Sequence, residues 1–392
     1  MTRTSSCHLV DMLAEVPDPR KKKGLRHPLA SMLALTVVGL LCGQRSYTQL
    51  AKWARLHPCL RNALGFTAKQ TPAASTFHYL YRRLDIATVE KTLTQWTTQT
   101  LASLRISTSN LKGLAIDGKT LGNSHPEDAR RTHLLAAVFH ELGIPVAECA
   151  VSEKTNEIPV SIELLKAFDV SGLVITTDAL LTQRKFCQQI LDAQADYCLP
   201  VKANQKQLYE DIRDLFEPLD ETDPPEVEHR RFENLHAEVG AHLQTYTNTE
   251  DAKGRITTRT LTTSTLLTEH TDWPGLQQVY QYTTHQKQKS TAHVKGFHVQ
   301  YGITSLSPER ASAADLLKLR RQHWTIENKL HWIRDAVFQE DASTVRTGVL
   351  PQVMAALRNT AISVLRFTGH TKITDALQLF AAKPILAVNI IK

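Results

Sequence analysis

The sequence predicts an α/β protein with a helical N-terminal region, a mixed sheet and a mostly β insertion near its C-terminal part. Apolar residues recur at helical spacing through roughly the first hundred residues. After residue 111, short β-prone runs alternate with helical patterns, in the order β-β-β-α-β-α-β. This order is typical of a mixed sheet with helices on its faces.

The N-terminal region is predicted to be basic and helical. Residues 1–100 hold 14 Lys and Arg against 5 Asp and Glu, a net charge of +9, whereas the whole chain carries +7. Helical spacing predicts helices over 29–43 and 47–56, and a third, capped by Ser75, that carries Arg82 and Arg83 on its polar side. Such a region fits either contact with a polyanion or the solvated face of a plain helical bundle.

Composition and cysteine spacing exclude several classes of protein. The apolar run at 29–43 is shorter than the roughly 20 residues that a membrane-spanning helix needs, so no membrane partner is expected. The six cysteines form no C-x-x-C pair, and reduced thiols are the simplest interpretation. We therefore expect a cytoplasmic protein.

The sheet region and the insertion are assigned from short periodic runs. A hairpin is expected at Glu141-Leu142-Gly143, and Ser312 with Asp315 forms a predicted capping box that starts a long regular helix to about Phe338. The predicted strands span 114–117, 133–140, 145–152, 173–177, 197–201, 254–263, 279–284 and 299–305, and the other helices 157–168, 182–194 and 205–216. The predicted domains are a helical region (1–105), the first part of the core (106–202), the β insertion (203–297), the rest of the core (298–345) and C-terminal helices (346–392).

Two local patterns suggest chemistry that their context disfavours. Residues 113–120 fit the phosphate-loop pattern G-x-x-x-x-G-K-[ST], but an apolar strand occupies the positions that should bend around phosphate, which weakens a P-loop ATPase hypothesis. His323, Glu327 and His331 have the residue types of a zinc site. Eight residues drift by about 80° around an α-helix, so the two histidines should splay apart.

Three acids on separate elements form a better candidate site. Asp117 is expected at the end of the first strand, Asp178 at the end of the fourth, and Glu327 on the long helix. If the first and fourth strands are parallel neighbours, both aspartates lie at the same edge of the sheet. Clustered carboxylates favour hard divalent cations, and two such ions about 3.5–4 Å apart can clamp the attacking and leaving oxygens of a phosphodiester. This pattern predicts nuclease or strand-transfer chemistry.

Several longer stretches resemble one family across most of the chain and in the same order. They are PDPRKKKGLRHPLASMLAL, LAIDGKTLGNS, EKTNEI, TTDALLTQ, DYCLPVKANQ and HWTIENKLHWIRDAVFQEDAS. They resemble the DDE insertion-sequence transposases of the ISAs group, which includes the H-repeat-associated proteins. The resemblance implies an RNase H-like catalytic core and two Mg²⁺ ions, for which Mn²⁺ can substitute, held by Asp117, Asp178 and Glu327.

The resemblance also implies partners and contacts. Related transposases carry Y-(2)-R-(3)-E-(6)-K around the glutamate, and Arg320, His323 and Arg334 stand here at the Tyr, Arg and Lys places. We therefore expect DNA contacts from His323, Arg334, Lys119, Arg82 and Arg83, with Trp324 as a stacking residue. The expected partners are the terminal repeats of an element and target DNA, bound by a homodimer on paired ends in the bacterial cytoplasm at the nucleoid. A catalytically silent DNA-binding descendant of a transposase remains the alternative.

Overall fold

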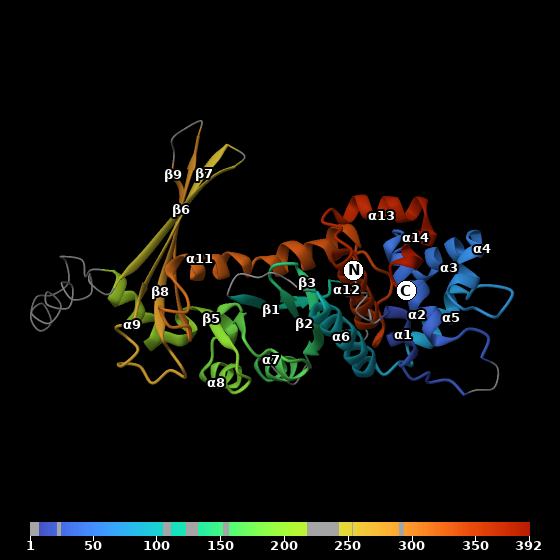
Figure 1. Ribbon diagram of the computed structural model, residues 1–392, viewed down its shortest axis with the longest axis horizontal. Helices are drawn as coiled ribbons and strands as arrows, with labels where there is room; N and C mark the ends of the chain where they lie inside the picture. Colours follow the sequence, from blue (N-terminus) through green and yellow to red (C-terminus); the bar gives the residue numbers. More distant parts are fainter. Residues whose placement is uncertain are drawn as a thin grey trace, which may run out of the picture. The chain divides into compact units, whose positions relative to one another are not determined.

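The chain divides into two compact units, which we call the first and second unit (Figure 1). This computed structural model describes residues 8–21, 25–104, 111–122, 132–151, 157–217, 243–252, 254–289 and 294–392. The first unit comprises Met1–Ser107, Asp117–Asp169 and Thr325–Lys392, and the second comprises Thr108–Ile116 and Val170–Trp324. Residues 218–242 of the predicted β insertion lie outside the described residues.

Helices from both ends of the chain build most of the first unit. Helix α2 is buried along almost its whole length and contacts α1, α3 and α12, which explains its apolar sequence. None of the described helices is long and apolar enough to cross a bilayer. Helix α5 has Ala73 as its N-cap, so the prediction that Ser75 caps this helix is wrong. The helices are α1 (Leu9–Ala14), α2 (Leu29–Leu41), α3 (Tyr47–Leu56), α4 (Pro58–Ala63), α5 (Ala74–Tyr81), α6 (Ile86–Ser103), α7 (Glu157–Lys166), α12 (Leu350–Phe367), α13 (Ile373–Ala382) and α14 (Pro384–Asn389).

The sheet of the first unit has the order β3-β2-β1. Strands β2 (His133–Phe139) and β3 (Ile144–Val151) pair antiparallel through a turn in which Gly143 adopts a positive φ of 66°. A positive φ suits glycine because it lacks a Cβ atom. Helices α6 and α12 pack against β3. This confirms the predicted hairpin.

Strand β1 (Lys112–Thr120) also begins the sheet of the second unit, whose order is β1-β4-β5-β9-β8-β7-β6. Strand β1 is parallel to β4 (Leu173–Thr176), and β4 is parallel to β5 (Asp196–Val201). The remaining strands are antiparallel: β6 (Gln244–Ala252), β7 (Arg255–Ser264), β8 (Gln278–Gln288) and β9 (Val294–Thr304). The short helices of this unit are η2 (Ala179–Leu181), α8 (Arg184–Asp192), η3 (Ala203–Gln205) and α9 (Lys206–Phe216). The predicted order β-β-β-α-β-α-β and the parallel pairing of the first and fourth strands are confirmed, as is the α/β fold class with a mixed sheet.

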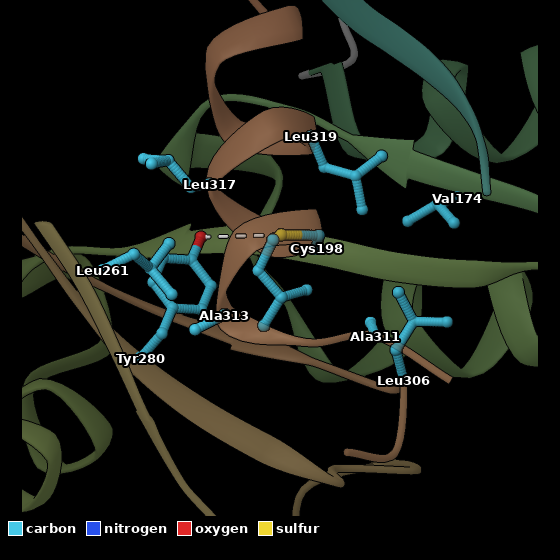
Figure 2. Packing of buried hydrophobic residues seen from close by; sticks show 10 residues of the cluster. Val174, Cys198, Leu261, Tyr280, Leu306, Ala311, Ala313, Leu317 and Leu319 are labelled. Atoms are coloured by element: carbon cyan, nitrogen blue, oxygen red, sulfur yellow. Dashed lines mark hydrogen bonds between the residues drawn. The ribbon is translucent and has the colours of Figure 1, made fainter. Parts of the chain in front are cut away.

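The core of the second unit lies between helix α11 (Ala313–Gln322) and the sheet (Figure 2). Tyr280 on β8 and Cys198 on β5 are buried beneath the helix. A side chain at Gly302 on β9 would collide with the Tyr280 ring, so the close packing of this ring requires glycine there. Leucines of α11 complete the cluster, which fixes the helix to the sheet.

The predicted long helix is regular only in its first part. Helix α11 begins with the predicted capping box of Ser312 and Asp315 and ends at Gln322. The later part consists of two π-helical segments, η4 (Glu327–His331) and η5 (Ile333–Val337). Their backbone N–H groups bond five residues back, as from Phe338 to Ile333 at 3.0 Å. The prediction of a continuous α-helix to Phe338 is therefore wrong.

A polar pocket lies where α6, β3 and α12 of the first unit meet. Its volume is about 30 Å³, and its lining includes Glu90, Glu148 and Asn359. Gln352 donates a hydrogen bond of 2.7 Å to Glu90. Glu148 Oε1 and Asn359 Oδ1 accept no hydrogen bond from the described part of the chain. Burial raises the pKa of Glu90 to about 8, so this carboxyl group is mostly protonated at neutral pH.

We expect Glu90→Gln to stabilise the protein increasingly as the pH rises from about 5 to about 8. The folded-state pKa of Glu90 lies above its unfolded value, so its stabilising contribution is complete below the unfolded pKa and is lost as pH rises to about 8. The variant should exceed the wild type in free energy of unfolding by on the order of 2 kcal/mol at pH 8, with little difference near pH 5. Urea unfolding across this pH range measures the effect.

The control for this experiment is Glu163→Gln, which removes a carboxylate from an exposed ion pair with Lys166. It should leave the pH dependence of stability close to that of the wild type. Parallel stability curves for Glu90→Gln and the wild type would contradict the assignment of a buried, protonated Glu90.

Candidate metal centre

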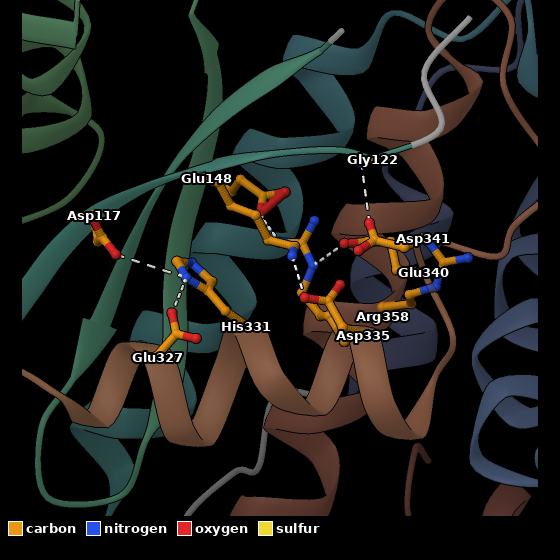
Figure 3. A network of polar contacts seen from close by, with 11 residues as sticks. Asp117, Gly122, Glu148, Glu327, His331, Asp335, Glu340, Asp341 and Arg358 are labelled. Carbon is orange, nitrogen blue, oxygen red and sulfur yellow. Dashed lines mark hydrogen bonds and ion pairs between the residues drawn. The ribbon is translucent and has the colours of Figure 1, made fainter.

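Three side chains with metal-binding groups meet in the first unit (Figure 3). One ligand atom from each of Asp117, Glu327 and His331 lies within 4.8 Å of the others. His331 Nδ1 is 3.3 Å from Glu327 Oε2 and 3.8 Å from Asp117 Oδ2. The imidazole is buried, whereas half of the Glu327 side chain is exposed. The imidazole nitrogen thus lies on the buried side of the group, and the Glu327 carboxylate lies on the side open to solvent.

Two different backbone elements place these ligands. Asp117 lies within β1, which continues to Thr120, so the prediction that the strand ends at Asp117 is wrong. Glu327 and His331 are the first and last residues of the π-helical segment η4. A π-helix has about 4.4 residues per turn, so residues four apart still project from nearly the same side. Short π-helical turns are frequent at functional sites.

The donor set fits a divalent cation. Carboxylate oxygens are the preferred ligands of Mg²⁺ and Mn²⁺, and neutral imidazole binds many divalent ions. The sequence prediction included Asp117 and Glu327 and considered His331 only as part of a zinc pattern. The structure brings these three residues together.

Asp178 lies in the second unit, just after β4. Its carboxylate accepts hydrogen bonds from the backbone N–H groups of Leu180 at 3.0 Å and Leu181 at 3.4 Å, and so caps η2. The side chain is exposed. In the register of the second unit, Ala115 on β1 pairs with Thr176 on β4. Asp117 lies two residues after Ala115, and Asp178 lies two residues after Thr176.

Lys119 pairs with an acid that the sequence prediction did not include. Its Nζ atom lies 2.5 Å from Asp335 Oδ2, and only 10% of its side chain is exposed. Phosphate contact by Lys119 stays a prediction. Residues 112–120 form a strand, so the phosphate-loop pattern has no phosphate-binding loop and the ATPase alternative is wrong.

His323 lies in the second unit and is uncharged at neutral pH. Its Nδ1 atom is 3.1 Å from Thr176 Oγ1. Burial lowers the pKa of His323 to about 3, and the charge of nearby Arg320 adds to this shift. His323 therefore cannot supply the cationic role at its place in the motif, although a hydrogen bond to DNA stays a prediction. Trp324 beside it is 59% exposed, and its stacking role also stays a prediction.

The prediction that Arg334 contacts DNA is wrong. The side chain is fully buried and forms ion pairs with Glu148 and Glu340, so it cannot reach DNA in this conformation. The helix geometry explains the error. Seven residues of α-helix would return Arg334 to nearly the same side as Glu327, whereas at about 4.4 residues per turn it projects roughly to the opposite side.

Arg334 belongs to a buried charge network that connects three elements of the first unit (Figure 3). Glu340 accepts hydrogen bonds from Arg334 Nε at 2.7 Å and from Arg358 Nη1 at 2.9 Å. Arg334 also donates to Glu148 on β3, which accepts a second bond from Asn359 at 2.9 Å. Burial alone would raise the pKa of Glu340, but Arg334 and Arg358 outweigh it and hold this pKa below its usual value. We call Glu148, Arg334, Glu340 and Arg358 the charge quartet.

The sequence contained one signal for this network. Arg358 interrupts the apolar pattern of α12, and an arginine within a buried helix requires a charged partner. Its partner Glu340 lies 18 residues away in sequence, so no local pattern identifies the pair.

Arg82 and Arg83 are exposed at the C-terminal end of α5. Their position is compatible with contact to a large anionic partner. DNA contact by these residues stays a prediction.

Two family models together match most of the chain. The family model for the transposase DDE domain matches residues 108–364, and the DDE_Tnp_1-associated model matches residues 10–97. The chain is 26% identical to the Escherichia coli K12 protein called "H repeat-associated putative transposase YhhI", over 91% of this chain and 90% of that protein. It is 31% identical to an uncharacterised Xanthobacter autotrophicus protein from the dhlA 3′ region, over 67% of this chain and 83% of that one. Among solved structures, a piggyBac transposase synaptic complex with hairpin DNA matches 97% of this chain and 76% of that chain, with a TM-score of 0.45 and 11% identity.

We expect Glu340→Gln to destabilise the first unit strongly. The substitution leaves two buried guanidinium groups with one carboxylate fewer, and breaking a buried ion pair costs about 3–5 kcal/mol. Urea unfolding of the variant and the wild type measures the difference in free energy of unfolding.

Glu250→Gln is the matched control for this substitution. Glu250 also contacts two arginines, Arg259 and Arg321, but 41% of its side chain is exposed. Its loss should cost at most about 1 kcal/mol, because water screens and replaces exposed ion pairs. Equal effects at the two sites would show that the charge quartet has no special role.

Proposed function

The chain belongs to the DDE transposase family, and from this premise we propose that it cleaves the ends of a DNA element and joins the freed 3′-hydroxyl to target DNA. The observation that carries the proposal is the meeting of Asp117 and Glu327 in one cluster of ligand atoms. These acids are 210 residues apart in sequence, and only the fold brings them together. A surface carboxylate without a function has no need of a second carboxylate beside it.

Asp178 is proposed as the third carboxylate of the site. The parallel pairing of β1 and β4 supports this role, because Ala115 and Thr176 are register partners and each precedes an aspartate by two residues. Its Oδ1 atom accepts the two backbone hydrogen bonds at η2, which orient the carboxylate. An exposed, oriented carboxylate is a suitable metal ligand.

Asp117, Asp178 and Glu327 would hold two Mg²⁺ ions, with Mn²⁺ as a substitute. When bound, such a pair of ions supplies a nucleophilic oxygen and stabilises the leaving 3′-oxygen of a phosphodiester. The residues of this chain bind and orient the reacting groups. The carboxylates set where the ions lie, and Lys119, after exchange of its partner Asp335, would contact a phosphate oxygen.

DNA binding is proposed for the basic N-terminal helices. Arg82 and Arg83 lie exposed at the end of α5, and the first hundred residues carry a net charge of +9. Side chains that neutralise phosphates position a protein on DNA without reading its sequence. A homodimer on paired element ends would let two active sites act on two ends.

We expect Asp178→Asn to abolish metal-dependent cleavage and preserve binding to the element ends. The amide keeps the shape of the side chain but removes the charge that would hold the ion. Cleavage should fall at least about a hundredfold, since even changes outside the ligand shell cost 10- to 100-fold. Gel assays with DNA that carries the terminal repeats measure cleavage and binding on the same samples.

The control is Asp272→Asn, because Asp272 is fully exposed and lies 3.6 Å from Arg184 in an ion pair. It should cleave like the wild type. Full cleavage by Asp178→Asn would refute the proposed site. End binding without cleavage by the wild type would instead support the silent descendant of a transposase.

We expect Arg82→Ala and Arg83→Ala to weaken DNA binding in a salt-dependent way. Each lost phosphate contact should reduce the slope of log affinity against log salt by about one. Fluorescence anisotropy with element-end DNA at several salt concentrations measures this slope.

Lys166→Ala serves as the control, since Lys166 is an exposed lysine paired with Glu163 on α7. Its slope should match that of the wild type. Unchanged slopes for both arginine variants would place the DNA contacts elsewhere.

A further inference from the structure

We infer that His331 is a nitrogen ligand of the divalent ion held between Asp117 and Glu327, so that this position binds Mn²⁺ more selectively over Mg²⁺ than carboxylates alone would. The inference rests on the proposed function, which supplies the divalent ion. It adds an imidazole to a set that was expected to consist of three acids. The third ligand at this position is then His331, and the metal that it favours is Mn²⁺.

Two separations between the ligand atoms are close to those expected around a single ion. Metal–ligand distances of about 2.1 Å place neighbouring ligand atoms about 3.0 Å apart in an octahedron and about 3.4 Å apart in a tetrahedron. His331 Nδ1 lies 3.3 Å from Glu327 Oε2 and 3.8 Å from Asp117 Oδ2. An ion between them needs only a small adjustment of the Asp117 side chain.

The surroundings of His331 fix the imidazole in this position. Its side chain is 5% exposed, whereas the Glu327 side chain is 51% exposed. Buried neighbours Leu330 and Ile333 anchor the backbone on either side. Three residues further on, Arg334 is held by the charge quartet. A ligand held by packing on both sides is preorganised, whereas Glu327 is free to adjust to the ion.

The mixed donor set determines which metals fit. Mg²⁺ prefers oxygen ligands, while imidazole increases affinity for transition metals in the order Mn²⁺ below Co²⁺ and Zn²⁺. Removing His331 should therefore weaken Mn²⁺ binding more than Mg²⁺ binding. Removing an acid should weaken both.

The experiment uses the full chain with Mn²⁺ alone and without DNA. Pulsed electron paramagnetic resonance detects the coupling of Mn²⁺ to a directly bound imidazole nitrogen. We expect this coupling in the wild type, a frequency change when histidine is labelled with ¹⁵N, and loss of the coupling in His331→Gln. Titration should show at least about a tenfold loss of Mn²⁺ affinity in this variant, and less than about threefold for Mg²⁺.

His133→Gln is the matched control. His133 is another histidine of the first unit that pairs with a carboxylate, at 2.7 Å from Glu157. Its variant should keep the nitrogen coupling. Because the coupling is measured first in the wild type, its absence overturns the inference even if His331→Gln fails to fold.

Two results would overturn the inference: Mn²⁺ bound by the wild type without nitrogen coupling, or no Mn²⁺ bound at all. Neither depends on DNA cleavage. A protein that cleaves DNA but shows no nitrogen coupling keeps the proposed function and loses the inference. A protein that shows the coupling but cleaves no DNA keeps the inference and loses the proposed function.

Discussion

The charge quartet in the first unit connects strand β3, the π-helical segment η5 and helix α12 through groups that have almost no access to water. A buried guanidinium or carboxylate is tolerated only with a partner at hydrogen-bond distance, so these elements cannot shift independently. Glu340 and Arg334 are central to this constraint, because Glu340 contacts both arginines and Arg334 contacts both glutamates. The segment that carries Glu327 and His331 immediately precedes Arg334 and therefore has one permitted placement.

The candidate metal centre inherits its geometry from this constraint. Asp117 lies within β1, which neighbours β2 in the sheet of the first unit. Glu327 and His331 are fixed by η4, and the following segment is tied to the core by Arg334. Buried ion pairs add little net stability, but here they fix one arrangement of β3, η5 and α12. A cluster of metal ligands needs such a fixed arrangement.

The sequence predicted correctly the features that depend on residues close together in the chain. The strand order and the capping box of Ser312 and Asp315 follow from periodicity and spacing, and both are present. The expected places of the acids at a strand end and on the long helix identified Asp117 and Glu327 as candidates, the motif resemblance agreed, and the structure shows that they meet. The role of Arg334 was mistaken because its burial depends on Glu148, which is 186 residues away, and on a π-helical turn that apolar spacing does not reveal. His331 was missed as a partner of Asp117 for the same reason.

The ion pair between Lys119 and Asp335 makes phosphate binding at this position an exchange of one anion for another. A free phosphate or nucleotide gains a contact with Lys119 only by releasing a carboxylate of the same sign, so its net gain is small. A DNA strand held by contacts elsewhere brings its phosphate to high local concentration and can compete successfully. If Lys119 makes the proposed phosphate contact, this ion pair would disfavour small anions and admit a phosphate that arrives as part of a bound polymer.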